Sequence, residues 1–438
     1  MNVKLLNSIK MKISKLLVLV LMTVHYGFSQ QTPGAEQTES ILIENVTAHI
    51  GNGEVIENAA IGFQGGKITF IGSKEDVKGS FDQTIDGNSQ HVYPGFIAPN
   101  STLGLVEIDA IRASDDVAEM GSFNPNIRAI VAYNAESKVV ESVRPNGVLM
   151  AQITPRGGTF AGNSTIVQLD AWNYEDATIK NDDGNHLYWP STSYYNYRSG
   201  MVRANRNYQK QIQNISENLE QAKAYLTTSR NPFDLKFEAL SKVFSGKQKM
   251  YIHTNGAREM LDAIRVMEDH GIENFAFIGG FESYKITEVL ISKSIPVLLK
   301  RVHSLPNSED EDVRLPFKVA AELINAGVMV GLENSGQMER MQTRNLPFYA
   351  GTVVGYGVSY EQALQTITLN TAKILGIEDT TGSLEVGKDA TLFVSKGNAL
   401  EMSGNQLTHA FIQGRRVSLE THQTELYERY SKKYQTKK

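Results

Sequence analysis

The sequence contains no cysteine among its 438 residues. That absence excludes disulfide scaffolds, thiolate-held zinc, iron–sulfur clusters and cysteine nucleophiles. Any metal ion must therefore be held by nitrogen and oxygen ligands alone. An excess of basic residues is also missing, because 43 Lys and Arg face 48 Asp and Glu, which leaves a net charge of −5. This balance argues against a nucleic-acid partner and against an anionic membrane surface.

Two catalytic signatures are absent as well. No Gly-x-Ser-x-Gly elbow occurs, so a serine hydrolase has no support. Residues 156–162 (RGGTFAG) are rich in glycine but lack the Gly-Lys-Ser/Thr ending of a phosphate-binding loop. Nucleotide binding is therefore set aside, and these glycines are interpreted as a tight loop after a strand.

The apolar run at residues 16–22 (LLVLVLM) is too short to span a bilayer as a permanent helix. Gly27 and Ser29 follow it at positions that a signal peptidase favours, and four lysines precede it: Lys4, Lys10, Lys12 and Lys15. We predict that residues 1–29 are a secretory signal cleaved near Ser29, so that the protein is secreted or periplasmic. The alternative is an uncleaved membrane anchor, whereas a lipoprotein anchor is excluded by the missing cysteine. Cleavage removes four lysines and no acid, so the net charge falls to −9.

The pattern of apolar, polar and glycine residues changes along the rest of the chain. With 41% apolar and 21% charged residues it has the composition of a soluble globular protein, and its length suits a large α/β barrel with a smaller domain. Short alternating strands with glycine turns fill residues 30–92, and β texture returns in residues 377–420. Residues 421–438 form a charged, helix-like tail.

Residues 93–376 alternate strand-like and helical runs, which predicts parallel crossovers and a (β/α) barrel. Within it, residues 186–247 are predicted to be an insertion that combines an aromatic segment, including Tyr194, with a long polar helix at 203–228. Such an insertion either covers the loop face of a barrel as a lid or forms a packed surface excursion or subunit contact. The predicted strands are 147–153, 165–169, 250–253, 274–278, 295–299 and 327–331. A helix is predicted around residues 257–269, with Met260, Leu261, Ile264 and Met267 on one face.

Four segments together resemble the metal-dependent amidohydrolase superfamily, in its imidazolonepropionase-like branch. They are GGKITFIG, IDGNSQHVYPGFIAPNSTLGL, YIHTNGA, and EQALQTITLNTAKILGI with the GSLEVGKDATLFV that follows. The resemblance implies an α/β fold with a (β/α)8 TIM-like barrel and a composite β-sandwich built from both chain ends. It also implies hydrolysis of carbon–nitrogen bonds other than peptide bonds, such as those of cyclic amides, with one or two divalent, zinc-like metal ions.

The metal ligands that the resemblance implies are largely replaced. The family's His-x-His pair on the first strand aligns with Asn100 and Thr102, and the sixth-strand histidine aligns with Gly279. His253 falls on the fifth-strand histidine, and Glu333 lies nearest the eighth-strand aspartate, although a two-residue slip would place Ser335 there. Two donors are fewer than the three that a hydrolytic zinc centre needs. His253 is therefore predicted either to ligate a metal or to be hydrogen-bonded inside the barrel mouth, and Glu333 either ligates or acts as the base.

Further groups leave alternatives open. His303, with Lys300 and Arg301, is predicted either to bind an anionic substrate group or to form a plain surface cluster. Tyr194 would offer a stacking surface on a lid. The acids at 107, 109, 115 and 116 are either an oxygen-rich site for magnesium, calcium or manganese or, as the simpler interpretation, solvated loop residues.

Two hypotheses follow. The first is an exported amidohydrolase-fold hydrolase with an unusual metal site at His253 and Glu333. The second is a catalytically silent barrel that binds a small molecule, assembles as a homo-oligomer or pairs with an active relative. Both expect a small-molecule ligand, no nucleic acid and no stable membrane anchor.

Overall fold

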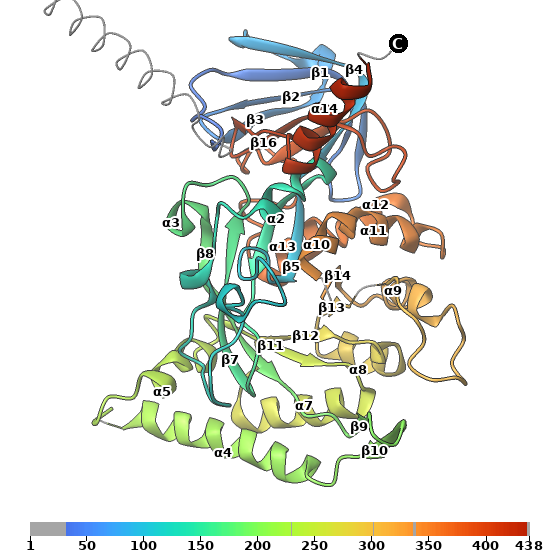
Figure 1. Ribbon diagram of the computed structural model, residues 1–438. Helices are drawn as coiled ribbons and strands as arrows, with labels where there is room; N and C mark the ends of the chain where they lie inside the picture. Colours follow the sequence, from blue (N-terminus) through green and yellow to red (C-terminus); the bar gives the residue numbers. More distant parts are fainter. Residues whose placement is uncertain (1–31, 229, 301, 336–338, 436–438) are drawn as a thin grey trace, which may run out of the picture. The chain divides into compact units, whose positions relative to one another are not determined.

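The computed structural model describes residues 32–228, 230–300, 302–335 and 339–435 (Figure 1). The chain divides into two compact units, Met1–Thr32 and Pro33–Lys438, and every element below belongs to the second. The predicted signal segment, residues 1–29, lies outside the described residues, so its cleavage stays a prediction. Within the described ranges no helix has both the length and the apolar character needed to cross a membrane.

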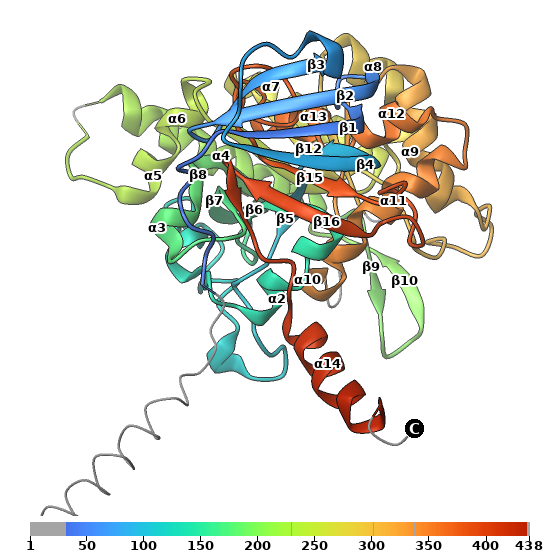
Figure 2. The ribbon, with the colours of Figure 1, turned by 90° about the horizontal axis from the view of Figure 1, so that it is seen from above.

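A seven-stranded sheet draws its strands from both ends of the chain (Figure 2). Parallel pairing joins β1 to β4, and the C-terminal β15 joins the other side of β4 in antiparallel register, with Phe393 opposite Tyr93. The sheet-rich domain expected from the two β-textured ends is therefore present and is composite. In spatial order its strands are β17 (Arg415–Arg416), β16 (Leu407–Ile412), β15 (Leu392–Ser395), β4 (Gln83–Pro94), β1 (Ile41–His49), β2 (Val55–Gln64) and β3 (Lys67–Ser73).

A second sheet of eight strands forms the barrel, which confirms the predicted α/β barrel architecture. Apart from the first half of β8, its strands are almost continuously buried, as strands covered on both faces should be. In spatial order they are β5 (Phe96–Ser101), β6 (Val148–Ile153), β7 (Phe160–Gln168), β8 (Thr178–Tyr188), β11 (Lys249–Thr254), β12 (Phe275–Gly279), β13 (Val297–Leu299) and β14 (Val330–Leu332).

One barrel strand runs against the others. β7 is antiparallel to both β6 and β8, whereas the other neighbouring pairs are parallel. The expectation of parallel crossovers throughout is wrong here. Parallel neighbours need a connection of about a dozen residues or more, and residues 154–159 and 169–177 are too short to provide one.

The barrel is closed by a helix junction. No strand pairing joins β14 to β5 in the described residues; instead the junction between α12 (Tyr360–Gln365) and α13 (Leu369–Leu375) accepts a hydrogen bond from each strand. The amide of Leu332 donates to the carbonyl of Thr366, and the amide of Ile97 donates to that of Ile367, both at 2.9 Å. The segment EQALQTITLNTAKILGI thus completes the ring of backbone hydrogen bonds.

The insertion contributes a hairpin and a long helix. β9 (Ser193–Asn196) and β10 (Met201–Ala204) form an exposed antiparallel ribbon, and α4 (Tyr208–Thr227) lies beside α7 (Ala257–His270) (Figure 1). β8 extends to Tyr188, so the first three residues of the predicted insertion belong to a barrel strand. On α7, Met260, Ile264 and Met267 are buried as expected, but Leu261 is exposed because it lies off that face.

The remaining helices are short, and several cover the outside of the barrel (Figure 1). Helix α7 ends at Gly271, whose left-handed backbone provides a glycine cap. The predicted domain boundaries at residues 92, 376 and 420 stay predictions. Besides α4, α7, α12 and α13, the α-helices of the described residues are α2 (Lys138–Glu141), α3 (Tyr174–Ala177), α5 (Leu235–Ala239), α6 (Ser241–Phe244), α8 (Thr287–Ser292), α9 (Leu315–Ala326), α10 (Glu339–Gln342), α11 (Leu346–Val354) and α14 (His422–Gln435).

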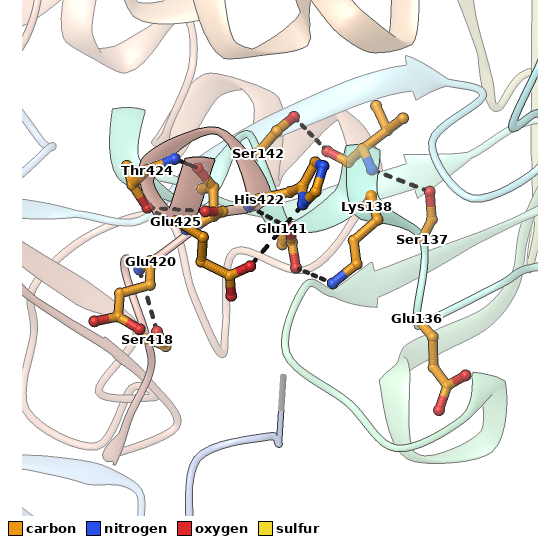
Figure 3. A network of polar contacts seen from close by, with 12 residues as sticks. Glu136, Ser137, Lys138, Glu141, Ser142, Ser418, Glu420, His422, Thr424 and Glu425 are labelled. Atoms are coloured by element: carbon orange, nitrogen blue, oxygen red, sulfur yellow. Dashed lines mark hydrogen bonds and ion pairs between the residues drawn. The ribbon is translucent and has the colours of Figure 1, made fainter. Parts of the chain in front are cut away.

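The charged tail is the helix α14, and its first turn is held by α2 (Figure 3). The carboxylate of Glu141 accepts a hydrogen bond from the backbone amide of His422 at 2.7 Å and is itself paired with Lys138. A carboxylate at the N-terminus of a helix is also stabilised by the positive pole of the helix dipole. No residue of α14 is buried, so the anchoring is confined to its start.

Candidate functional site

A pocket of about 420 Å³ opens at the carboxyl ends of the barrel strands. Residues at the ends of five strands line it: Asn100 on β5, Tyr188 on β8, His253 on β11, Gly279 on β12 and Glu333 directly after β14. Ligand sites of barrel enzymes lie at this end because the loops there are free to vary while the strands stay rigid. The pocket is therefore the candidate functional site.

His253 meets a second histidine that the sequence analysis did not single out. Nδ1 of His186 lies 2.8 Å from Nε2 of His253, because β8 and β11 are parallel neighbours and place alternate residues on one face. The ring of Tyr188 stacks on His253 with centroids 4.0 Å apart. Burial lowers the pKa of both imidazoles well below its usual range, and for His253 the neighbouring His186 lowers it further. Both rings are therefore neutral at pH 7.

Below the histidines lies a buried polar chain. Nε2 of His186 is 2.8 Å from Oγ of Ser164, and that hydroxyl donates to Asp183 at 2.8 Å. Gln152 and Tyr251 also donate to the Asp183 carboxylate, at 2.7 and 3.2 Å. Ser164 and His186 are fully buried, so the serine is not accessible to a substrate as a nucleophile.

The hydrogen-bond chain assigns the tautomers of both rings. Because the hydroxyl of Ser164 donates to Asp183, His186 must donate to that oxygen from Nε2. Nδ1 of His186 then accepts, so Nε2 of His253 carries the proton that is shared between the rings. The nitrogen of His253 that faces His186 is consequently a donor and has no lone pair for a metal ion.

Asp183 should make stability depend on pH in a specific direction. Burial raises its pKa from 3.8 to about 6, so between these values the folded state holds more protons than the unfolded state. The free energy of unfolding contributed by this group falls as pH rises through that window, by about 3 kcal/mol in total. We expect the unfolding free energy of the wild type minus that of Asp183→Asn to fall by this amount between pH 4 and 7. Urea unfolding across the window measures it, and a difference that rises with pH would contradict the assignment.

Arg156 reaches across the pocket to Asn100. Its two terminal nitrogens donate to Oδ1 of Asn100 at 2.9 Å and to the carbonyl of the same residue at 2.8 Å. Asn100 has a φ of 51°, in the left-handed region that asparagine tolerates better than most residues. The guanidinium also lowers the pKa of both His186 and His253, after burial.

Glu333 is fully buried where β14 ends. Ser335 donates to its carboxylate from the hydroxyl at 2.8 Å and also from the backbone amide. Both residues line the pocket, so either alignment of the eighth strand brings one of them to it. The two hydrogen bonds from Ser335 fix the orientation of the carboxylate.

Gly279 occupies a position that no histidine could take without moving the backbone. Its φ is 98°, and a Cβ atom would lie 2.7 Å from Oδ1 of Asn255 and 2.8 Å from the carbonyl of Thr254.

We expect Gly279→Ala to lower the free energy of unfolding by about 2–3 kcal/mol, measured by urea unfolding. Gly357→Ala is the matched control, because Gly357 has a φ of 95° with open space around it. It should cost only the backbone strain, about 1 kcal/mol, and equal losses in the two variants would exclude the steric contribution.

The structure separates the other predicted residues from the pocket lining. His303 lies 2.6 Å from the hydroxyl of Thr352 and packs edge-on against Tyr349, while Tyr194 lies on the exposed hairpin. Thr102 is buried and is not part of the lining, whereas Lys300 is. Arg301 lies outside the described residues.

The acidic positions proposed as an oxygen-rich site have other partners. Glu107 accepts hydrogen bonds from Asn134 and Ser137, and Asp109 is paired with Arg340. Both acids are exposed. They do not join Glu333 in the pocket lining.

The donor set does not fit a catalytic metal centre. In the described part of the chain, no three His, Asp or Glu side chains are arranged so that they could hold a metal ion. Only two of the donors expected from the sequence, His253 and Glu333, line the pocket, and Glu333 already accepts two hydrogen bonds from Ser335. A hydrolytic zinc ion needs three protein ligands and an open position.

Comparisons with known proteins agree with this architecture. The family model described as "Amidohydrolase family" matches residues 253–417. The chain is 24% identical over 379 residues to "Amidohydrolase tasK" of Hapsidospora irregularis, which covers 73% of this chain and 37% of that protein. It is also 24% identical over 161 residues to an imidazolonepropionase of Flavobacterium psychrophilum, covering 33% of this chain and 39% of the relative. The chain thus spans under two fifths of the length of these relatives.

Among solved structures, an amidohydrolase from Thermotoga maritima superposes with a TM-score of 0.76 at 24% identity. The match covers 86% of this chain and 99% of that structure. An ochratoxinase of A. niger superposes with a TM-score of 0.53 at 15% identity, covering 87% and 96%. At these identities the likeness concerns the fold.

Proposed function

This chain contains an amidohydrolase-family domain, and on that premise we propose that it hydrolyses carbon–nitrogen bonds other than peptide bonds in the barrel-mouth pocket. One observation carries the proposal: Glu333, His253, Arg156 and Lys300 line the same 420 Å³ cavity. A carboxylate, an imidazole and two cations are the groups that amide hydrolysis requires for proton transfer and for charge stabilisation. Amidohydrolases generally use divalent metal ions, but no step of this proposal involves one.

Glu333 and Arg156 have defined tasks in the proposed reaction. The carboxylate of Glu333 takes a proton from water while the water oxygen adds to the substrate carbonyl carbon. The guanidinium of Arg156 donates to the oxygen on which negative charge develops. The carbon–nitrogen bond then breaks, its electron pair leaves with the nitrogen, and that nitrogen takes the proton from Glu333. The products are a carboxylic acid and an amine.

The remaining cavity sets the shape of the substrate. A second pocket of about 460 Å³ adjoins the first and shares Asn255, Gly256, Glu259, Lys300 and Ser191 with it. A ligand longer than a single ring would extend from the inner pocket past Lys300 into the outer one. We propose cyclic amides and N-acyl amines as the substrate class, because both can occupy the first pocket and extend into the second.

The test is hydrolysis by the purified full-length chain after treatment with a chelator. A panel of cyclic amides and N-acyl amines would be incubated with the protein, and the acid and amine products would be measured by mass spectrometry. We expect turnover of at least one member of the panel, unchanged by the chelator. Tyr427→Ala should hydrolyse the same substrates as the wild type, because Tyr427 is 74% exposed on α14 and does not line the pocket.

A second candidate function is binding without catalysis, alone or beside an active relative. The specific observation in its favour is that Nε2 of His253 is committed to His186. Under this alternative the same panel contains ligands that raise the melting temperature of the chain, and none is hydrolysed. Absence of hydrolysis across the panel would therefore reject the first candidate.

We further propose that residues 1–29 direct export, so that the pocket works on extracytoplasmic small molecules. The basis is the sequence pattern of lysines, short apolar run and small residues. N-terminal sequencing of secreted material tests it: a first residue near position 30 supports cleavage, and an intact N-terminus contradicts it.

A further inference from the structure

We propose that the guanidinium of Arg156 takes the place of a metal ion in the barrel mouth and excludes divalent cations from the pocket. The inference rests on the proposed site, and it specifies which group supplies the permanent positive charge there. It explains why the donor set is incomplete although the barrel is preserved.

The position of Arg156 is the first support. Asn100 stands where the resemblance places the first imidazole of the family's His-x-His pair, and it is this residue that Arg156 contacts with both terminal nitrogens. Residue 100 therefore presents its oxygens to a cation, as a metal ligand would, but that cation belongs to the protein. The guanidinium also reaches the carbonyl of Thr154 at 3.4 Å, which links the ends of β5 and β6.

The backbone adapts to this contact. The left-handed φ of Asn100 directs its side-chain oxygen and its carbonyl oxygen to the same guanidinium. A planar fork of donors matches two such acceptors, whereas the point charge of an ammonium group does not. Asparagine is suited to this backbone, and a β-branched residue is not.

A second cation borders the same cavity. Lys300 and Arg156 both line it, together with His253 and Glu333. A divalent ion entering the pocket would therefore meet two fixed positive charges, the guanidinium of Arg156 and the ammonium of Lys300. Each of these opposes binding of a cation.

The experiment measures zinc bound to the purified full-length chain by equilibrium dialysis with elemental analysis. We expect the wild type and Arg156→Lys to hold less than about a tenth of an equivalent. The informative variant is Asn100→Asp, which adds a carboxylate without changing the side-chain size. With Arg156 intact it should still bind no zinc, because the new carboxylate pairs with the guanidinium. With Arg156→Gln added, it should bind about one equivalent, since His253, Glu333 and the new carboxylate then supply three donors.

The outcomes distinguish this inference from the proposed function. About one equivalent of zinc on the wild type, lost in Glu333→Gln, overturns the inference and leaves hydrolysis open. Equal zinc contents with and without Arg156→Gln in the Asn100→Asp background also overturn it, provided that both variants melt cooperatively. Should the double variant fail to fold, zinc bound by the wild type would still overturn the inference, and so would zinc bound by Asn100→Asp, in which Arg156 is intact. A metal-free wild type that hydrolyses nothing rejects the proposed function and supports the exclusion of metal.

Discussion

Asp170→Asn is expected to lower the free energy of unfolding by about 3–5 kcal/mol. The Asp170 carboxylate is buried and pairs with Arg144, which is only 3% exposed. It also accepts hydrogen bonds from Arg415 at 3.3 Å and from the backbone amide of Gly34 at 2.7 Å. The amide variant leaves Arg144 as a buried charge without its counter-ion, and that is the costly state. Urea unfolding monitored by circular dichroism measures the loss.

The matched control is Asp312→Asn. Asp312 forms an ion pair with Lys318 on the surface, where solvent screens the attraction. Its removal should cost less than about 1 kcal/mol. Asp170 contacts both Arg415 of the composite sheet and Arg144 before β6. Similar losses in the two variants would show that these buried contacts contribute no more to stability than a surface ion pair.

Glu333→Gln should lower kcat for carbon–nitrogen hydrolysis by about 10²–10⁴-fold. Glutamine keeps the size of the side chain but cannot take a proton from water. KM should change little, because the proposed role of Glu333 is proton transfer. The measurement is steady-state kinetics on whichever panel substrate the wild type hydrolyses.

Ser335→Ala provides the comparison for Glu333. It removes the 2.8 Å hydrogen bond to the carboxylate but leaves the base in place. We expect a smaller fall in kcat than in Glu333→Gln, because the carboxylate loses one contact that positions it but can still accept a proton. Unchanged kcat in Glu333→Gln would place the base elsewhere in the pocket.

Several features followed from the sequence because they depend on local pattern. Alternation of apolar and polar residues predicted β strands at both ends of the chain, and the helical period of Met260, Ile264 and Met267 predicted α7. His253 was expected at the end of a strand and before a helix, and it lies there because β11 and α7 have clear signals on either side. Replacement of the first-strand imidazoles by Asn100 and Thr102 was also visible directly.

Other features could not be read in this way because they join distant residues. His186 and His253 are 67 positions apart, and they meet only through the register of β8 and β11. A signal did exist, since His186 lies two residues before Tyr188 on the same strand, but the aromatic residues that follow suggested a lid. For His303 the sequence suggested a residue that binds an anionic group, because Lys300 and Arg301 lie close to it in the chain. In the structure His303 packs against Tyr349 and is not part of the pocket lining.

The residue order by itself determined the resemblance to the amidohydrolase family and most of the succession of strands and helices. Local periodicity and the identity of single residues are enough for these, because no partner has to be known. Only the tertiary structure decided what occupies the barrel mouth. Arg156 and Asn100 lie 56 positions apart, and a guanidinium in a glycine-rich loop has no preferred direction until the ends of β5 and β6 are placed side by side.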